Sequence, residues 1–371
     1  HHEGSSRGFN DNISELISFK QKYRDFYDSY YNTNLSTKNE KFEIYPRRIK
    51  SDFVQVKKLL AVTHNLNFEG APISMFEMIC EIARISNFKI TVVSLQDGPL
   101  LTEYENKGIE VKVINFPSRH ISKYDFDNFL VSWAEKSKLE QYDLLYANTL
   151  DSYFAIKIAS EKGIPSVWNI RESISADKVF QSLDPVIAQK AYSCFSLPYK
   201  IVFVAYSTEN IYRCLDTTSN FKVIKNSISP QRFHSNSLTE NDNELTVSED
   251  ENVILCVGTI CERKGQKDLI EAFMKLPQNL QENTTIVFAG NGDTNYCKRI
   301  RKIVNNHLLL RKKIVFLESS AHVKSLYKKS DIYVCTSKEE SYPRVILEAM
   351  HFNLPIITTP VYGISEQVIE D

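Results

Sequence analysis

The chain alternates short apolar runs with longer stretches in which apolar residues recur every three or four positions. Short apolar runs bounded by turn residues are typical of buried strands, and the longer period is typical of amphipathic helices. In the amino-terminal half this pattern predicts strands at residues 59–63, 89–94, 110–114, 144–147, 166–170, 201–204 and 222–225. It predicts helices at residues 73–85, 100–107, 126–136, 153–162 and 185–194.

Residues 236–252 interrupt the alternation, because they are polar and acidic and show no apolar period, which is typical of a linker or mobile loop. The alternation then restarts, with strands predicted at 253–257, 285–289, 313–317, 332–335 and 355–359 and helices at 266–276, 295–306, 321–329 and 343–352. Two successive strand–helix–strand series predict an α/β protein with two doubly wound, Rossmann-like domains that face each other, at residues 51–235 and 253–371.

Residues 1–50 precede the first series. The opening His1-His2-Glu3-Gly4-Ser5-Ser6 is typical of an expression-tag remnant and is set aside. The rest of this segment is polar and contains one predicted helix, carried by Ile13, Leu16, Ile17, Phe19, Tyr23 and Phe26. We therefore expect an amino-terminal helical appendage, with the tail of an upstream domain as the alternative.

Composition narrows the class of protein. The chain has 371 residues, a net charge of -1 and 42% apolar residues, which indicates a globular protein and argues against a nucleic-acid partner. No run approaches the ~20 apolar residues that span a bilayer. The seven cysteines form no CxxC pair, as expected of free thiols in a reducing compartment. We expect a cytoplasmic protein, and peripheral contact with the inner face of the membrane stays an open expectation.

Two carboxylates near the carboxyl terminus have an informative spacing. Pro343 suits the first position of a helix, so Glu340 is expected in the preceding loop and Glu348 within the helix. Both carboxylates can accept hydrogen bonds from hydroxyl groups, which suits a sugar and a ribose. The alternative is that Glu348 and Arg344, four residues apart, form an ordinary ion pair on the helix surface.

The turns after predicted strands are the places where such sheets bind ligands. Arg263 and Lys264 stand just before the helix predicted at 266–276, where positive charges oppose the helix dipole unless an anion such as a diphosphate binds there. The alternative is a pair of solvated surface cations. The turn Gly290-Asn291-Gly292 follows the next strand and would let the backbone approach a ligand.

A metal-dependent alternative rests on Asp125-Phe126-Asp127, a triplet of the kind that binds divalent cations. These acids stand where a helix is predicted to begin, and acids in a first turn serve as caps. The histidines form no cluster with ligand spacing. We therefore expect no metal and no cofactor.

These segments together resemble the retaining, nucleotide-sugar-dependent glycosyltransferases of family 4, also called glycosyl transferases group 1, which have the GT-B fold. The resemblance covers residues 55–371 and is carried by Val257-Gly258, Lys264-Gly265, the segment 288–292, the block from Glu340 to Pro355, and the segment 363–366, in the family's order. In the first half, Thr63-His64-Asn65 and Gly70-Ala71-Pro72 resemble the family's glycine loop, and Asn226-Ser227 resembles its interdomain Asn-Gly.

The resemblance implies transfer of a sugar from a nucleotide-diphosphate sugar to a hydroxyl of a carbohydrate, glycolipid or protein acceptor, in polysaccharide or glycoconjugate assembly. It implies that Lys264 binds the donor diphosphate, that Glu348 binds the ribose and that Glu340 lies against the donor sugar. The expected catalytic set consists of Lys264, Arg263 and Glu340. The other expected donor-binding residues are Gly258, Thr259, Gly290, Asn291, Gly292, Ser341, Tyr342, Arg344 and Arg171, and the expected acceptor-side residues are His64, Asn65, Gly70 and Ala71.

The sequence departs from the family's pattern at three places. Thr259 stands where the family often has arginine, and Arg171 stands where many members have histidine, so Arg171 is a candidate replacement. The family also continues beyond the segment 363–366, so we expect a truncated second domain here. These departures favour, as the alternative function, a sugar-nucleotide-binding module or scaffold with little turnover. A dinucleotide-dependent oxidoreductase is disfavoured because no GxGxxG motif opens a helix.

Overall fold

A computed structural model describes residues 56–114, 121–229, 250–290, 294–318 and 323–369, and the single positions Ser18, Phe233, Ser248 and Gly292. The chain divides into a unit of residues 1–55 and a compact unit of residues 56–371. The appendage expected within residues 1–50 and most of the linker expected at 236–252 lie outside the described residues.

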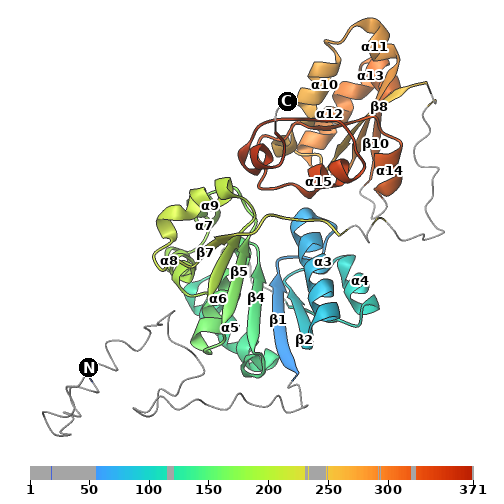
Figure 1. Ribbon diagram of the computed structural model, residues 1–371. Helices are drawn as coiled ribbons and strands as arrows, with labels where there is room; N and C mark the ends of the chain where they lie inside the picture. Colours follow the sequence, from blue (N-terminus) through green and yellow to red (C-terminus); the bar gives the residue numbers. More distant parts are fainter. Residues whose placement is uncertain are drawn as a thin grey trace, which may run out of the picture. The chain divides into compact units, whose positions relative to one another are not determined.

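The first half of the compact unit is a parallel seven-stranded sheet with the strand order β3-β2-β1-β4-β5-β6-β7 (Figure 1). The strands are β1 (Lys57–Thr63), β2 (Phe88–Ser94), β3 (Glu110–Val113), β4 (Leu144–Asn148), β5 (Ser166–Ile170), β6 (Lys200–Phe203) and β7 (Phe221–Val223). The helices between them are α3 (Gly70–Ile85), α4 (Leu100–Asn106), α5 (Lys123–Ser137), α6 (Tyr153–Glu161), α7 (Ala176–Phe180), α8 (Pro185–Ser193) and α9 (Tyr206–Tyr212).

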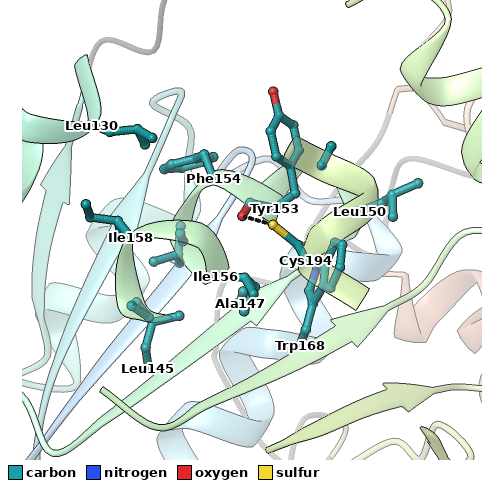
Figure 2. Packing of buried hydrophobic residues seen from close by; sticks show 14 of the residues in the cluster. Leu130, Leu145, Ala147, Leu150, Tyr153, Phe154, Ile156, Ile158, Trp168 and Cys194 are labelled. Atoms are coloured by element: carbon teal, nitrogen blue, oxygen red, sulfur yellow. Dashed lines mark hydrogen bonds between the residues drawn. The ribbon is translucent and has the colours of Figure 1, made fainter. Parts of the chain in front are cut away.

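Both faces of this sheet are covered, because successive side chains of a strand point to opposite sides. On β1, Leu59 and Ala61 join the apolar cluster under α3 and α4, whereas Leu60 and Val62 join the cluster under α5, α6 and α8. The second cluster is rich in aromatic rings. Trp168 is completely buried in it (Figure 2). Its indole N–H donates to the Thr149 carbonyl at 2.8 Å.

The second half is a parallel five-stranded sheet with the order β10-β9-β8-β11-β12. Its strands are β8 (Asn252–Val257), β9 (Thr284–Ala289), β10 (Ile314–Leu317), β11 (Ile332–Cys335) and β12 (Ile356–Thr358). Its helices are α10 (Gln266–Phe273), α11 (Gln278–Glu282), α12 (Asn295–Asn305), α13 (Leu308–Lys313), α14 (Lys324–Lys328) and α15 (Arg344–His351), and short 3-10 turns lie at η6 (Glu262–Lys264) and η7 (Tyr362–Glu366). Apolar clusters lie on both faces of this sheet as well.

Every strand that the apolar pattern predicts is present, and the differences lie at the ends. The last strand of the first sheet, predicted at 222–225, is Phe221–Val223. The predicted helix 343–352 begins at Arg344, because Pro343 itself has an extended backbone with ψ 128°. Residues 321 and 322 of the predicted helix 321–329 lie outside the described residues. The helices α7, α9, α11 and α13, which are five to seven residues long, are not among those that the pattern predicts.

The two sheets place their turns in the same way. In the first sheet the strand order reverses between β1 and β4, and in the second it reverses between β8 and β11. Loops that leave the carboxyl ends of such neighbouring strands diverge and leave room for a ligand. The residues that follow these four strands are therefore the candidates for chemistry. Within the described ranges no helix combines the length and the apolar character that a membrane span needs.

Candidate active site

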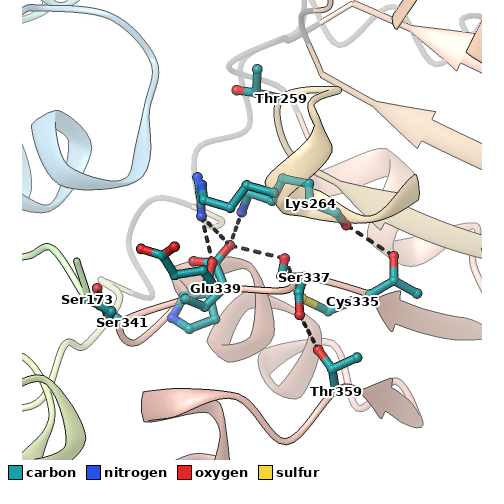
Figure 3. Close-up of polar contacts among 12 residues, drawn as sticks. Ser173, Thr259, Lys264, Cys335, Ser337, Glu339, Ser341 and Thr359 are labelled. Carbon is teal, nitrogen blue, oxygen red and sulfur yellow. Dashed lines mark hydrogen bonds and ion pairs between the residues drawn. The ribbon is translucent and has the colours of Figure 1, made fainter. Parts of the chain in front are cut away.

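Lys264 and Glu340 meet where the strand order of the second sheet reverses. Lys264 closes the 3-10 turn between β8 and α10, Glu340 lies in the loop between β11 and α15, and their side chains form an ion pair. Arg263 also reaches this carboxylate at 3.2 Å and donates to the Glu339 carbonyl at 2.8 Å. Ser337 donates to the same carboxylate oxygen at 3.2 Å, and Figure 3 shows Lys264 and Ser337 directed toward the same point.

This carboxylate is ionised in spite of its burial. Glu340 is only 9% exposed, and burial by itself would raise its pKa. The positive charges of Lys264 and Arg263, with the hydrogen bonds from Lys264 and Ser337, outweigh burial and hold the pKa of Glu340 below its usual value. The interpretation of two solvated cations is therefore wrong for Lys264, whose side chain is 14% exposed, whereas Arg263 is 47% exposed.

Close backbone contacts fix the loops that carry these groups. Gly265 has a left-handed backbone with φ 65°, and a side chain there would come within 2.2 Å of the Thr336 carbonyl oxygen. Thr336 in turn donates its hydroxyl to the carbonyls of Lys264 and Gly265 at 3.1 and 2.8 Å. A side chain on Gly290 would lie 2.1 Å from the Gly258 carbonyl oxygen. Only glycine allows the loops after β8, β9 and β11 to approach so closely.

The second carboxylate of the pair lies inside α15, as the spacing predicts. Glu348 is 3% exposed and accepts a hydrogen bond from the Tyr327 hydroxyl at 3.0 Å. Arg344, 5% exposed, donates to Glu77 at 2.6 Å, to Ser74 at 3.2 Å and to the Ser227 carbonyl at 3.1 Å. The expected alternative of an ion pair on the helix surface is wrong, because Arg344 and Glu348 are both buried.

Arg171, the first residue after β5, lies beside the same loop. Its guanidinium donates to the amide oxygens of Asn148 at 2.6 Å and Asn226 at 2.7 Å. Its carbonyl accepts from the Ser341 hydroxyl at 2.6 Å, and Asn226 donates to the Tyr342 carbonyl at 2.9 Å. The structure thus links Arg171, Ser341 and Tyr342, three residues singled out by sequence, through backbone and amide contacts.

The residues expected on the acceptor side gather where the order of the first sheet reverses. His64 follows β1, Thr149 follows β4, and the His64 ring nitrogen lies 3.3 Å from the Thr149 hydroxyl. The other ring nitrogen lies 3.9 Å from Glu69, which also accepts a hydrogen bond from Asn65 at 3.3 Å. The neighbouring His64 ring lowers the pKa of Glu69 against the effect of its burial. Thr149 has φ 77°, a strained backbone for a β-branched residue, and strain of this kind gathers at functional sites.

The remaining expected residues occupy different surroundings. Gly70 and Ala71 begin α3, and the Ala71 carbonyl accepts from Asn148 at 3.2 Å. Thr259 is exposed and its carbonyl accepts from Gln266 at 3.0 Å. Gly292 packs against Cys297, whose Sγ would lie 2.5 Å from a side chain at this position. Asn291 lies outside the described residues.

The acids of the Asp125-Phe126-Asp127 triplet have structural partners. Ser122 caps α5 by accepting from the Asp125 backbone N–H at 3.2 Å and donating to its carboxylate at 2.7 Å. Asp127 forms an ion pair with Lys190 of α8. Among the described residues, no three histidine, cysteine, aspartate or glutamate side chains are grouped closely enough to hold a metal ion.

The sequence analysis does not single out several residues of the site. Ser337 could have been found, because it lies two positions after the strand that ends at Cys335. Asn148 likewise ends β4. Glu77 has no such marker, since it is one of several polar residues on α3. Glu366, part of a motif noted in the sequence, proves to accept hydrogen bonds from the backbone N–H groups of Tyr206 and Ser207 at 3.1 and 2.8 Å, at the start of α9.

Solved structures define the class to which this fold belongs. The structure of HepE from Anabaena, in complex with UDP and glucose, superposes with a TM-score of 0.67 at 20% sequence identity, covering 85% of this chain and 83% of that one. The arrangement of two doubly wound parallel sheets is the GT-B fold, as the resemblance implied.

Sequence comparison finds similar proteins. Residues 238–371 match the family described as glycosyl transferases group 1. An uncharacterised glycosyltransferase of Methanocaldococcus jannaschii is 35% identical over 151 residues, which are 39% of this chain but only 37% of that protein. The capsular polysaccharide biosynthesis glycosyltransferase CapH of Staphylococcus aureus is 21% identical over 311 residues, 83% of each chain.

Proposed function

We propose that this chain transfers a sugar from a nucleotide-diphosphate sugar to a hydroxyl acceptor, with retention of the anomeric configuration and without a metal ion. The observation that carries the proposal is the cluster of Lys264, Arg263 and Glu340 where the order of the second sheet reverses. Two cations held against a buried carboxylate before a helix suit the negative charge of a diphosphate.

The chemistry of the leaving group explains the need for these charges. When the bond between the anomeric carbon and the phosphate oxygen breaks, positive charge develops on the sugar and negative charge on the diphosphate. Cations already held in place stabilise that negative charge without reorganisation. The acceptor hydroxyl forms the new bond on the same face of the sugar, and its proton passes to the departing phosphate oxygen. No electrons are gained or lost by the protein.

The two carboxylates have separate parts in this proposal. Glu340 holds Lys264 and Arg263 in position and lies against the donor sugar, because it comes from the loop at the carboxyl end of β11. Glu348 accepts hydrogen bonds from the ribose hydroxyls from its position within α15. Arg171, held by Asn148 and Asn226, adds a further positive charge next to Ser341. His64 and Asn65, with Gly70 and Ala71 at the start of α3, form the acceptor side.

The comparisons narrow the substrates to be tested first. HepE is described in complex with UDP and glucose, so UDP-glucose is the first donor to test. CapH is named for capsular polysaccharide biosynthesis, which supports a carbohydrate or lipid-linked carbohydrate acceptor. We place the reaction in polysaccharide or glycoconjugate assembly.

A thermal-shift screen of UDP, GDP, ADP and dTDP sugars tests donor binding, because a ligand that binds the native state raises the melting temperature. We expect one nucleotide class to raise it equally with and without EDTA. Release of free sugar, or of a product whose anomeric configuration is read by NMR, then tests turnover. A donor that binds but is neither hydrolysed nor transferred would favour the alternative, a sugar-nucleotide-binding module. Binding that disappears with EDTA would contradict the metal-free proposal.

A further inference from the structure

Arg171 carries a positive charge that no carboxylate of the described chain neutralises. It is the first residue after β5 and is half-buried. Within the described residues no ion pair joins its guanidinium to an aspartate or a glutamate. A charge held partly away from water is costly unless an opposite charge meets it, so the missing partner of Arg171 needs an explanation.

Three asparagine amides hold the Arg171 guanidinium in place. Its Nε donates to the Asn148 oxygen at 2.6 Å, and its Nη1 donates to the Asn226 oxygen at 2.7 Å. Asn169 accepts from Nη2 at 3.3 Å when its amide oxygen faces the guanidinium, and in that orientation its nitrogen donates to the Val202 carbonyl at 3.3 Å. Amide oxygens are neutral, so they orient the cation without cancelling its charge.

The acid next to Arg171 in the chain, Glu172, has other partners. Its carboxylate accepts from the backbone N–H of Leu150 at 3.0 and 3.1 Å and from the backbone N–H of Arg171 at 2.9 Å. Burial raises the pKa of Glu172, whereas a guanidinium beside this carboxylate would lower it. The charge of the Arg171 side chain is therefore left for a group outside the chain.

The guanidinium lies beside the loop that is proposed to face the donor sugar. Ser341 and Tyr342 directly follow Glu340 in this loop. The Ser341 hydroxyl donates to the Arg171 carbonyl at 2.6 Å. Asn226, which accepts from the guanidinium, also donates to the Tyr342 carbonyl at 2.9 Å. These contacts place the unneutralised charge next to the proposed sugar site.

The hydrogen-bond donors that remain on Arg171 fit a carboxylate. A guanidinium has five N–H groups, and the three amides take one from each nitrogen, which leaves one on each terminal nitrogen. Two such groups match the two oxygens of a carboxylate. The hydroxyl groups of a neutral sugar would leave the charge unpaired. The diphosphate of the donor already has Lys264 and Arg263, which come from the turn η6 of the second sheet.

We propose that Arg171 recognises the carboxylate of an acidic sugar, so that the donor of this chain carries a uronic acid. This inference rests on the proposed transfer reaction and names the class of sugar that is transferred. Asn148, Asn169 and Asn226 are positioning residues in it, because they aim the guanidinium and keep its charge available to the substrate.

Isothermal titration calorimetry with the full chain tests the inference by comparing matched donors. The pairs are UDP-glucuronate with UDP-glucose and UDP-galacturonate with UDP-galactose, or the same sugars on another nucleoside diphosphate if the thermal-shift screen selects it. We expect the acidic member of at least one pair to bind about 10- to 100-fold more tightly, the range for a hydrogen bond to a charged group.

The outcomes separate this inference from the proposed function. Equal affinities within each pair would overturn the inference and leave the transfer reaction standing. Tighter binding of the neutral members would overturn it as well. If none of the nucleotide sugars binds, the proposed function fails, and the inference fails with it.

Two single variants distinguish the sugar carboxylate from the diphosphate as the partner of Arg171. Arg171→Gln should lower the ratio of acidic to neutral affinity to about one, because the amide carries no charge for the carboxylate. The matched control is Arg263→Gln, which should weaken both members of a pair by the same factor and keep the ratio. If Arg171→Gln also keeps the ratio, Arg171 binds the diphosphate and the inference is wrong. The wild-type comparison needs no variant and stands even if Arg171→Gln does not fold.

A substitution of Asn226 tests the need for neutral partners. Asn226→Asp places a carboxylate against the guanidinium and should abolish the preference for the acidic donor, although Arg171 is still present. Asn226→Leu also loses the donation to the Tyr342 carbonyl but adds no charge, so the preference should remain. Equal ratios in the two variants would contradict the inference.

Discussion

The side chains of Lys264 and Glu340 form an ion pair across the two loops that leave β8 and β11. These residues are 76 positions apart in the chain. They meet because β8 and β11 are neighbouring parallel strands, so that the loops at their carboxyl ends leave the same edge of the sheet. A second pair repeats this relationship in the first sheet, where His64 follows β1 and Thr149 follows β4.

Replacing Lys264 tests whether the cluster binds a diphosphate. Lys264→Ala should weaken binding of the nucleotide diphosphate by ~1–3 kcal/mol, the usual effect of losing a charged hydrogen bond. Isothermal titration calorimetry measures this directly. The matched control is Lys267→Ala on α10, where an exposed lysine pairs with an exposed Glu271 and where affinity should not change. Unchanged affinity in Lys264→Ala would contradict the donor site.

Substitution of the two carboxylates, Glu340 and Glu348, should have different effects. Glu348→Gln should weaken nucleotide binding, since Glu348 is proposed to accept from the ribose, whereas Glu340→Gln should chiefly lower the rate of sugar transfer. Nucleotide affinity by calorimetry and the transfer rate with a saturating donor distinguish the two. If neither substitution changes either quantity, the two residues have structural roles only.

Glu340 should also make stability depend on pH. In the unfolded chain a glutamate has a pKa of about 4.3, and in the folded protein the pKa of Glu340 is lower because of Lys264 and Arg263, which outweigh burial. The stabilisation is therefore complete above the unfolded value and is lost as the pH falls through the folded one. The difference in free energy of unfolding between wild type and Glu340→Gln should shrink as the pH falls below about 4.3. Urea unfolding across that range measures it, and a constant difference would contradict the assignment.

The buried ion pair between Arg344 and Glu77 joins α15 to α3. Arg344→Ala leaves the Glu77 carboxylate without this partner and should lower the free energy of unfolding by about 3 kcal/mol. Arg344→Leu/Glu77→Leu should recover part of that loss, because both charges are removed. Arg84→Ala, which breaks an exposed pair with Glu81 on the same helix α3, should have no measurable effect on unfolding by urea. A double variant less stable than the single one would count against the pair.

Gly363 contacts the loop that carries Glu340. A side chain there would lie 1.4 Å from the Ser341 carbonyl oxygen and 2.9 Å from the Ala205 Cβ. Gly363→Ala should therefore displace that loop and lower the free energy of unfolding by about 1–3 kcal/mol. It should also weaken nucleotide binding. Gly70→Ala is the control for stability, because a side chain at Gly70 meets nothing within 4 Å. Equal melting temperatures for the two variants would show that the loop can move without cost.

The strands and the longer helices could be predicted from the sequence because an apolar period is a local property. Residues 166–170, for example, read as a strand and form β5 without any change of boundary. The same local reasoning placed Glu340 before a helix and Glu348 inside it. It failed at Pro343, which lies one position outside α15, and it did not find the short helices α7 and α13.

Only the tertiary structure decided the partners of the charged side chains. The sequence offers Glu348, four positions away, as a partner for Arg344, but the structure brings in Glu77, which is 267 positions away. It also determined that Lys264 is largely buried against Glu340, whereas the adjacent Arg263 is half exposed. The physical reason is that helical and strand periods depend on neighbouring residues, whereas the burial and pairing of a charge depend on the order of the strands and on the loops that this order brings together.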